Sequence, residues 1–178
     1  MKRFFNSYWL LFLVASIIVI LDQTTKAIVR NSLAVNEYWS LWPWLTPIAR
    51  IVHLSNTGVA FGMFQGMGTV FAILAVIISG AIIYYYPRIP AEDWTLRVAL
   101  CMQLGGAVGN LIDRITQGFV TDFVSVGNFA VFNVADSCIT VGVGVLILGV
   151  WLQERRKKQA EAVQLVETDP IDKDRTEQ

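Results

Sequence analysis

Residues 105–136 read GGAVGNLIDRITQGFVTDFVSVGNFAVFNVAD, and this stretch leads out of one apolar segment and into the next. Its polar residues are Asn110, Asp113, Arg114, Asp122, Asn133 and Asp136. Such side chains are costly in lipid, so an apolar chain that keeps them indicates a function for them. We therefore expect a site here, with Asp122 and Asp136 as a catalytic carboxylate pair at the edge of a membrane.

The composition around this stretch is typical of a membrane protein. Of the 178 residues, 54% are hydrophobic and only 16% are charged, and the mean hydropathy is +0.52. One domain is expected from this length. The basic residues form no stripe interleaved with aromatic residues on a polar face, so a nucleic-acid partner is not expected.

The cysteines and the histidine give no metal-ligand pattern. Cys101 and Cys138 lie inside apolar segments, where cysteine behaves as a small hydrophobic residue. His53 is the only histidine, and zinc sites in proteins use mainly nitrogen and sulfur ligands. We therefore expect neither a metal nor another cofactor, and we expect His53 to be structural or exposed.

Four apolar segments are long enough to cross a hydrocarbon core of about 30 Å. They cover residues 4–29, 69–86, 94–112 and 129–152. The first begins like a secretory signal peptide, but no small-residue cleavage site follows it and its helical pattern continues through Asp22 and Lys26. The predicted fold class is an all-α membrane protein with four transmembrane helices.

The segments between the predicted spans differ from one another. Residues 31–68 contain Trp39, Trp42 and Trp44, which suits the membrane interface, and their second half predicts short strands and a turn. This segment should therefore be a small extracytoplasmic β or amphipathic region between the first two helices. Residues 113–128 are expected to form a polar loop, and residues 153–178 a polar cytoplasmic tail.

Charge asymmetry predicts the orientation. With four spans, one side of the membrane receives Lys2, Arg3, Arg88 and the basic run 155–158. The other side receives Arg30, Arg50 and Arg114. Because basic residues favour the cytoplasmic side, both termini should be cytoplasmic and the polar residues of 105–136 should gather near the outer face.

Two carboxyl groups held close together cannot both ionise cheaply, so they share a proton. One then acts as a base and the other as an acid, which suits hydrolysis of an amide bond by water. Asp122 in a loop and Asp136 about one turn inside a helix could meet if the connection containing Gly127 folds back. No serine or cysteine has a base partner placed by the sequence, so a nucleophilic triad is not expected.

Less specific interpretations exist for the same residues. An aspartate near a helix start can simply cap the helix, and Asp22 with Lys26 can be a helical ion pair as readily as a pair that positions substrate. Gly105 and Gly109 favour helix packing, and Asn56 fits a turn as well as a binding role. For the whole chain, a carrier or proton relay and a non-catalytic assembly protein are the alternatives to an enzyme.

Five sequence boxes closely resemble the bacterial lipoprotein signal peptidases, or signal peptidase II. The boxes are DQTTK from Asp22, NTGVAFG from Asn56, GGAVGNLIDR from Gly105, VTDF from Val120 and FNVADS from Phe132. They occur in the family's order, and the resemblance covers roughly residues 8–152. It implies an aspartic endopeptidase of the bacterial cytoplasmic (inner) membrane that cuts diacylglyceryl-modified prolipoproteins just before the lipidated cysteine.

The resemblance also assigns roles to individual positions. Asp122 and Asp136 match the catalytic dyad, and the positions that line or support the site are Asp22, Lys26, Asn56, Gly106, Asn110, Arg114 and Asn133. Asp113 shares one helical face with Asn110 and Arg114 and is expected beside them on the ground of that spacing. The implied partners are lipidated prolipoproteins and membrane lipid, and the cyclic peptide globomycin is the implied inhibitor. We expect a monomer.

Overall fold

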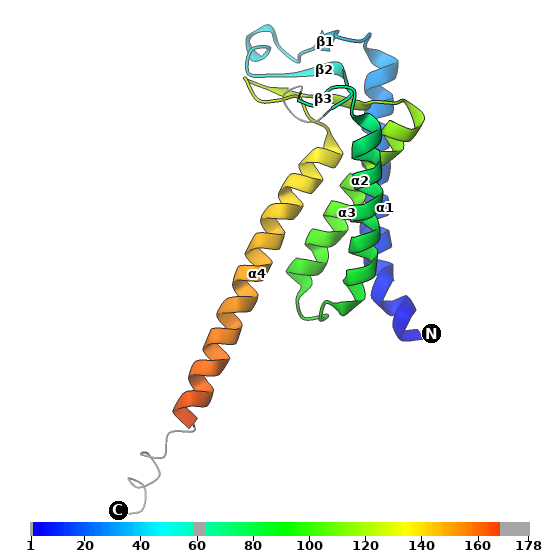
Figure 1. The fold of residues 1–178 in the computed structure, drawn as a ribbon. Helices are drawn as coiled ribbons and strands as arrows, with labels where there is room; N and C mark the ends of the chain where they lie inside the picture. Colours follow the sequence, from blue (N-terminus) through cyan, green and yellow to red (C-terminus); the bar gives the residue numbers. More distant parts are fainter. Residues whose placement is uncertain (1, 59–62, 168–178) are drawn as a thin grey trace, which may run out of the picture.

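The computed structural model describes residues 2–58 and 63–167, in which long helices carry a small sheet at one end (Figure 1). The elements in chain order are α1 (Lys2–Ser32), β1 (Tyr38–Trp39), η1 (Pro43–Leu45), β2 (Ala49–Asn56), α2 (Gly68–Tyr85), η3 (Tyr86–Arg88), α3 (Trp94–Thr116), β3 (Val120–Val126) and α4 (Val134–Glu167). The beginning of α1 and the end of α4 both lie at the end of the molecule away from the sheet (Figure 1).

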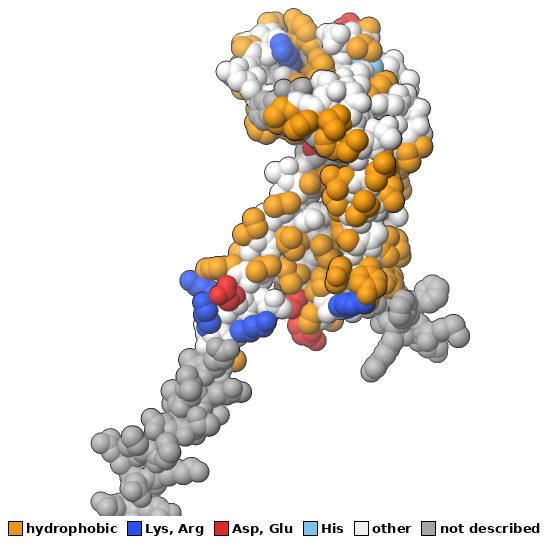
Figure 2. Space-filling view, in the orientation of Figure 1, with side chains coloured by type: hydrophobic (Ala, Val, Ile, Leu, Met, Phe, Trp, Pro, Cys, Tyr) orange, Lys and Arg blue, Asp and Glu red, His pale blue; other side chains and the backbone are white. Residues whose placement is uncertain are grey.

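Four segments within these helices are long and apolar enough to cross a membrane: Tyr8–Ser32, Gly68–Arg88, Trp94–Thr116 and Val134–Ala160. Their outer surfaces expose large apolar side chains, for example Ile77 and Ile147, which are 61% and 65% exposed. In Figure 2 apolar side chains cover much of the helical surface, and charged side chains gather at the end opposite the sheet. The predicted class, a mainly helical membrane protein with four spans, is confirmed.

Helix α3 lies at the centre of the bundle and contacts α1, α2 and α4. Its glycines allow close approach. A Cβ atom on Gly105 would lie 2.8 Å from the Cβ of Ile18 in α1, and one on Gly106 would lie 2.5 Å from the carbonyl oxygen of Ala135 in α4. Side chains at these positions would push the helices apart, which agrees with the packing interpretation of the glycines.

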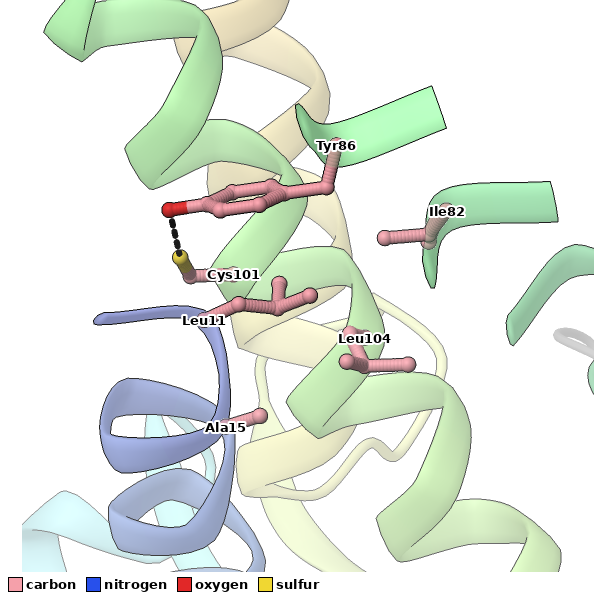
Figure 3. Packing of buried hydrophobic residues seen from close by; sticks show 6 residues of the cluster. All are labelled: Leu11, Ala15, Ile82, Tyr86, Cys101 and Leu104. Atoms are coloured by element: carbon pink, nitrogen blue, oxygen red, sulfur yellow. Dashed lines mark hydrogen bonds between the residues drawn. The ribbon is translucent and has the colours of Figure 1, made fainter. Parts of the chain in front are cut away.

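The apolar core lies where α1, α2 and α3 meet, and Figure 3 shows its members. They are Leu11, Ala15, Ile82, Tyr86, Cys101 and Leu104. The Cys101 thiol is fully buried and donates to the Tyr86 hydroxyl oxygen at 3.7 Å. Both cysteines are free, and Cys101 packs as the small hydrophobic residue that was predicted.

The sheet is antiparallel in the order β1-β2-β3. Strands β1 and β2 lie within the region 31–68, where short strands were predicted. Strand β3 corrects the prediction of a loop over residues 113–128, since α3 continues to Thr116 and β3 follows almost at once. The strand was missed because its polar residues suggested a loop, although Thr121 and Asp122 are in fact buried.

The fourth helix also differs from its predicted limits. It begins at Val134 rather than near residue 129, because residues 127–133 form a turn in which Gly127 adopts a φ of +50°. It continues to Glu167, so residues 153–167 of the predicted tail are helical and only residues 168–178 lie outside the described part of the chain. A 34-residue helix is about 51 Å long, well beyond the hydrocarbon core.

Candidate active site

Asp122 and Asp136 line one cavity of about 480 Å³ at the sheet end of the bundle. Asp122 comes from β3, and Asp136 comes from the first turn of α4. Other polar residues of its lining include Asn56, Asn110, Arg114 and Ser137, and the apolar wall includes Val120, Phe129, Ala130, Val131, Phe132, Ile139 and Val141. The fold thus brings together two acids that are fourteen positions apart in the sequence.

Amide side chains hold both carboxylates. Asn133 Nδ2 donates to Asp122 Oδ1 at 2.7 Å, and Asn56 Nδ2 donates to Asp122 Oδ2 at 2.9 Å. Asn110 Nδ2 donates to Asp136 Oδ1 at 2.7 Å. Asn133 Nδ2 also donates to Asn110 Oδ1 at 3.1 Å, so two amides link one acid to the other. This network fixes the carboxylate orientations, and in the part of the chain that the structure describes no basic side chain forms a direct ion pair with either acid.

A reciprocal cap explains the position of Asp136. The Asn133 side-chain oxygen accepts from the Asp136 backbone N–H at 2.9 Å, and Asp136 Oδ2 accepts from the Asn133 backbone N–H at 3.3 Å. This is a capping box with an aspartate at its third helical position. The capping interpretation of Asp136 therefore holds for one carboxylate oxygen, while the other oxygen bonds Asn110 beside the cavity.

Behind the cavity lies a buried ion cluster formed by Lys26, Asp22 and Asp113. Lys26 Nζ lies 2.8 Å from Asp22 Oδ2 and 3.2 Å from Asp113 Oδ2, and all three residues have 0% exposure. Lys26 also donates to Asn110 Oδ1 at 3.0 Å. These residues do not line the cavity. They support it through Asn110, whose amide they orient toward Asp136.

The two acidic residues of this cluster also hold the backbone of the elements that carry the dyad. Asp22 Oδ1 accepts from the Ala135 backbone N–H at 2.9 Å, which ties α1 to the start of α4. Asp113 Oδ2 accepts from the Thr121 backbone N–H at 2.9 Å, which ties α3 to β3. Each contact lies one residue before a dyad member in the sequence.

Two further members of this support were not predicted from the sequence. Gln23 Nε2 lies within hydrogen-bonding distance of Asp22, Asp113 and the carbonyl of Gly109. Arg30 donates to Thr121 Oγ1 at 3.0 Å and lies 3.6 Å from Asp113. Two features of the sequence could have pointed to these residues. Gln23 lies inside the DQTTK box, and Arg30 lies one helical turn after Lys26.

The remaining predicted residues fall into distinct places. Asn56 Oδ1 accepts from the Gly58 N–H at 2.9 Å while its amide bonds Asp122, so its turn role and its site role are both present. Arg114 lines the cavity and donates to the Gly58 carbonyl at 3.3 Å. Gly106 lies in the α3–α4 contact rather than in the cavity wall. His53 is buried, and its Nδ1 lies 2.8 Å from the Leu33 carbonyl oxygen in a hydrogen bond, in agreement with a structural role.

The electrostatics of Asp122 depart from those of an ordinary aspartate. Burial, and then the negative charge of Asp136, raise the pKa of Asp122 from 3.8 to about 6, while hydrogen bonds from Asn56 and Asn133 oppose the rise. A carboxyl group with a pKa near 6 exchanges a proton near neutral pH, which general acid or base catalysis requires. Within residues 2–58 and 63–167, no three His, Cys, Asp or Glu side chains are placed together to hold a metal ion.

The fold and the cavity define a multi-pass membrane protein with one buried carboxylate, Asp122, and one half-buried carboxylate, Asp136, facing one site. A family model for signal peptidase (SPase) II matches residues 14–152, and the chain belongs to this family, which makes it a peptidase. Curated relatives named lipoprotein signal peptidase include those of Shouchella clausii (39% identity, covering 84% of this chain and 97% of the relative) and Halalkalibacterium halodurans (40%, covering 83% and 96%).

Two solved bacterial membrane enzymes share the fold. One has a TM-score of 0.76 and 31% identity over 83% of this chain and 90% of its own, and the other a TM-score of 0.70 and 32% identity over 79% and 91%.

Proposed function

We propose that this peptidase removes signal peptides from diacylglyceryl-modified prolipoproteins, cutting before the lipidated cysteine, and that Asp122 and Asp136 are its catalytic dyad. The observation that carries the proposal is the joining of these two carboxylates on one cavity through Asn133 and Asn110. The relatives' name, lipoprotein signal peptidase, supports the substrate class.

In the proposed reaction, the ionised member of the dyad takes a proton from a water molecule whose oxygen attacks the scissile carbonyl carbon. The protonated member donates a hydrogen bond to the carbonyl oxygen as negative charge develops there. When the C–N bond breaks, the leaving nitrogen receives a proton from the dyad. Because the two acids titrate as one coupled system, the roles of acid and base belong to the pair.

The other cavity residues would bind and orient the substrate. Arg114 presents donors at the cavity, 3.3 Å from the Gly58 carbonyl, and can hold a backbone carbonyl of an extended peptide. Asn56 and Asn110 keep the carboxylates aligned while the substrate binds. A helical peptide bond is shielded by its own hydrogen bonds, so the substrate must unwind beside Asp136 before it is cut.

We also propose that the protein lies in the bacterial cytoplasmic membrane with both termini in the cytoplasm and the cavity near the outer face. The start of α1 and the end of α4 share one end of the molecule, where the basic run 155–158 lies, and this supports the orientation (Figure 1). At the opposite end, the exposed rings of Trp42 and Trp44 stack with centroids 6.0 Å apart, as suits an outer interface that receives membrane lipid and lipidated substrate.

The deciding experiment is cleavage of a purified lipidated prolipoprotein by wild type, Asp122→Asn and Asp136→Asn in detergent or bilayers. Each substitution should lower kcat by at least about a hundredfold, the scale of lost acid–base catalysis. Ser137→Ala, in the same cavity wall, is the matched control and should keep substantial activity. Near wild-type turnover in either aspartate variant, with folding verified, would refute the dyad.

Two further measurements test the rest of this proposal. Globomycin should compete with the prolipoprotein, because we place both in the cavity lined by Arg114 and the two acids. Inhibition that does not diminish as substrate is raised would contradict a shared site. The mass of the detergent-solubilised protein should correspond to one chain, and a stable dimer would refute the monomer prediction.

A further inference from the structure

A second groove lies between α1 and α2 at the end of the bundle opposite the sheet. It has a volume of about 590 Å³ and is lined by Tyr8, Gly80, Ile83, Tyr84, Pro87 and Arg88. Five of these residues lie on α2 and η3 at positions 80, 83, 84, 87 and 88, the spacing of one face of a helix. This Arg88 groove therefore runs along the axis of α2 for about 12 Å from Gly80 to Arg88.

The absence of a side chain at Gly80 opens the inner part of the groove. A Cβ atom built on Gly80 would meet no atom within 4 Å, so the space beside it is empty rather than filled by a neighbouring helix. The residue is exposed, and it lies within the membrane-spanning segment Gly68–Arg88. Hydrocarbon is the only solvent at this depth, and the apolar side chain of Ile83 continues the wall.

The end of the groove nearest the membrane surface carries a positive charge, Arg88, in a fixed position. Arg88 donates to the Tyr84 carbonyl, and its guanidinium lies 3.8 Å from the centre of the Tyr84 ring and 5.5 Å from that of Tyr85. Within residues 8–58 and 63–160, whose side chains the structure describes, no carboxylate forms an ion pair with Arg88. The guanidinium is thus oriented by neutral groups, and its charge is left for an anion.

These features together match the shape of a phospholipid. The cation lies at the membrane-surface end of the span, and the apolar groove continues from it toward the middle of the membrane. We propose that the Arg88 groove binds one anionic phospholipid of the leaflet opposite the sheet, with its phosphate on Arg88 and an acyl chain alongside Gly80. A headgroup without a compensating ammonium is favoured because no nearby described carboxylate balances the arginine.

Two substitutions separate the headgroup contact from the acyl-chain contact. Arg88→Gln removes the charge and should weaken phosphatidylglycerol binding about tenfold, the expected loss for one charge-assisted phosphate contact. Gly80→Leu places an apolar side chain in the groove, where its Cβ atom would meet nothing within 4 Å. Its matched control is Gly144→Leu on α4, where a Cβ atom also meets nothing within 4 Å. Lys157→Gln, at the same end of the molecule, controls for loss of a positive charge.

The measurement is native mass spectrometry of the full-length protein in mild detergent, titrated with phosphatidylglycerol or phosphatidylcholine. A phosphatidylglycerol carrying a diazirine on its acyl chain should also crosslink to residues 80–88. We expect one tightly held phosphatidylglycerol on wild type and both controls, weaker binding of phosphatidylcholine, and loss of the crosslink in Gly80→Leu. Equal binding of the two lipids, or equal binding by Arg88→Gln and wild type, would overturn the proposal.

The proposed peptidase activity is tested separately from this groove. The last part of α2 and η3, which carry Gly80 and Arg88, lie away from β3 and the start of α4, which carry the two acids (Figure 1). Arg88→Gln and Gly80→Leu should therefore cleave prolipoprotein at wild-type rates in bilayers of fixed composition. Loss of lipid selectivity with normal cleavage would leave the function standing. Crosslinks spread evenly over α2 and α4, unchanged in Gly80→Leu, would show only the general lipid shell and would refute a defined site.

Discussion

Replacing Asp122 by asparagine should change how the stability of the protein depends on pH. In the unfolded chain the carboxyl group titrates at its ordinary pKa of 3.8, and in the folded chain its pKa is about 6. Between these values the folded state binds more protons than the unfolded state. The contribution of this group to the free energy of unfolding therefore falls mainly as the pH rises from about 4 to about 6, and it is constant above about pH 7.

The size of the fall follows from the same two values. At about 1.4 kcal/mol for each pKa unit, the difference between 3.8 and about 6 corresponds to about 3 kcal/mol. The Asp122→Asn variant has no carboxyl group at this position, so its free energy of unfolding lacks this pH-dependent contribution. In the variant, one of the two accepting oxygens is replaced by an N–H₂ group, which then faces a donor of Asn133 or Asn56. The lost hydrogen bond lowers the free energy of unfolding by about 1–3 kcal/mol, and this cost does not vary with pH.

Thermal unfolding in detergent micelles, followed by tryptophan fluorescence from pH 4 to pH 8, gives the comparison. The free energy of unfolding of the variant minus that of wild type should rise by about 2 kcal/mol between pH 4 and pH 6, the larger part of the whole change, and level off above about pH 7. Asp122→Ser should give the same rise with a different constant offset. A difference that stays constant across this range would refute the raised pKa and the burial argument behind it.

Three further outcomes are expected. The kcat/KM of the peptidase should fall as the pH rises through an apparent pKa near 6, because this is the pKa of Asp122 beside an ionised Asp136 and the reaction needs one member of the dyad protonated. Activity that keeps rising through pH 6 would contradict this. Lys26→Met should lower the free energy of unfolding by about 3–5 kcal/mol, since it removes the ammonium that pairs with the buried carboxylate of Asp22 and leaves Asp113 with Arg30 alone. The exposed Lys157→Met should change this free energy by less than about 0.5 kcal/mol, and equal effects in thermal unfolding would contradict the buried cluster. Gly106→Ala should cost about 1–3 kcal/mol because its Cβ would lie 2.5 Å from the Ala135 carbonyl oxygen, while Gly144→Ala should be neutral or slightly stabilising in the same assay.

The four membrane-spanning helices could be predicted from the sequence because length and apolar composition are local properties. Strand β3 could not be recognised, since Thr121 and Asp122 are polar and their burial depends on partners in α1, β2 and α3. Two of these partners, Arg30 and Asn56, lie 91 and 66 positions away in the chain. The helical part of the predicted tail was missed for a related reason. The charged run 155–158 signals the end of the membrane but not the end of a helix.

The candidate site was more predictable in its composition than in its arrangement. The sequence boxes pointed to the polar residues, and the topology predicted that they gather at one face of the membrane. The separation into cavity-lining residues, such as Arg114, and buried supporting residues, such as Lys26, required the side-chain contacts. Gln23 and Arg30 were missed because their partners lie on α3 and β3, about ninety positions later.

The cap of α4 restricts its own sequence more than helix caps usually do. Serine, threonine, aspartate and asparagine commonly substitute for one another at such positions, because each needs only an oxygen that accepts from the helix. Asn133 must accept from the Asp136 N–H and also donate to both Asp122 and Asn110. A hydroxyl has one proton to give, and an ionised carboxylate has none. Asparagine is thus the one residue of this set that can begin the helix and hold the two acids in register at the same time.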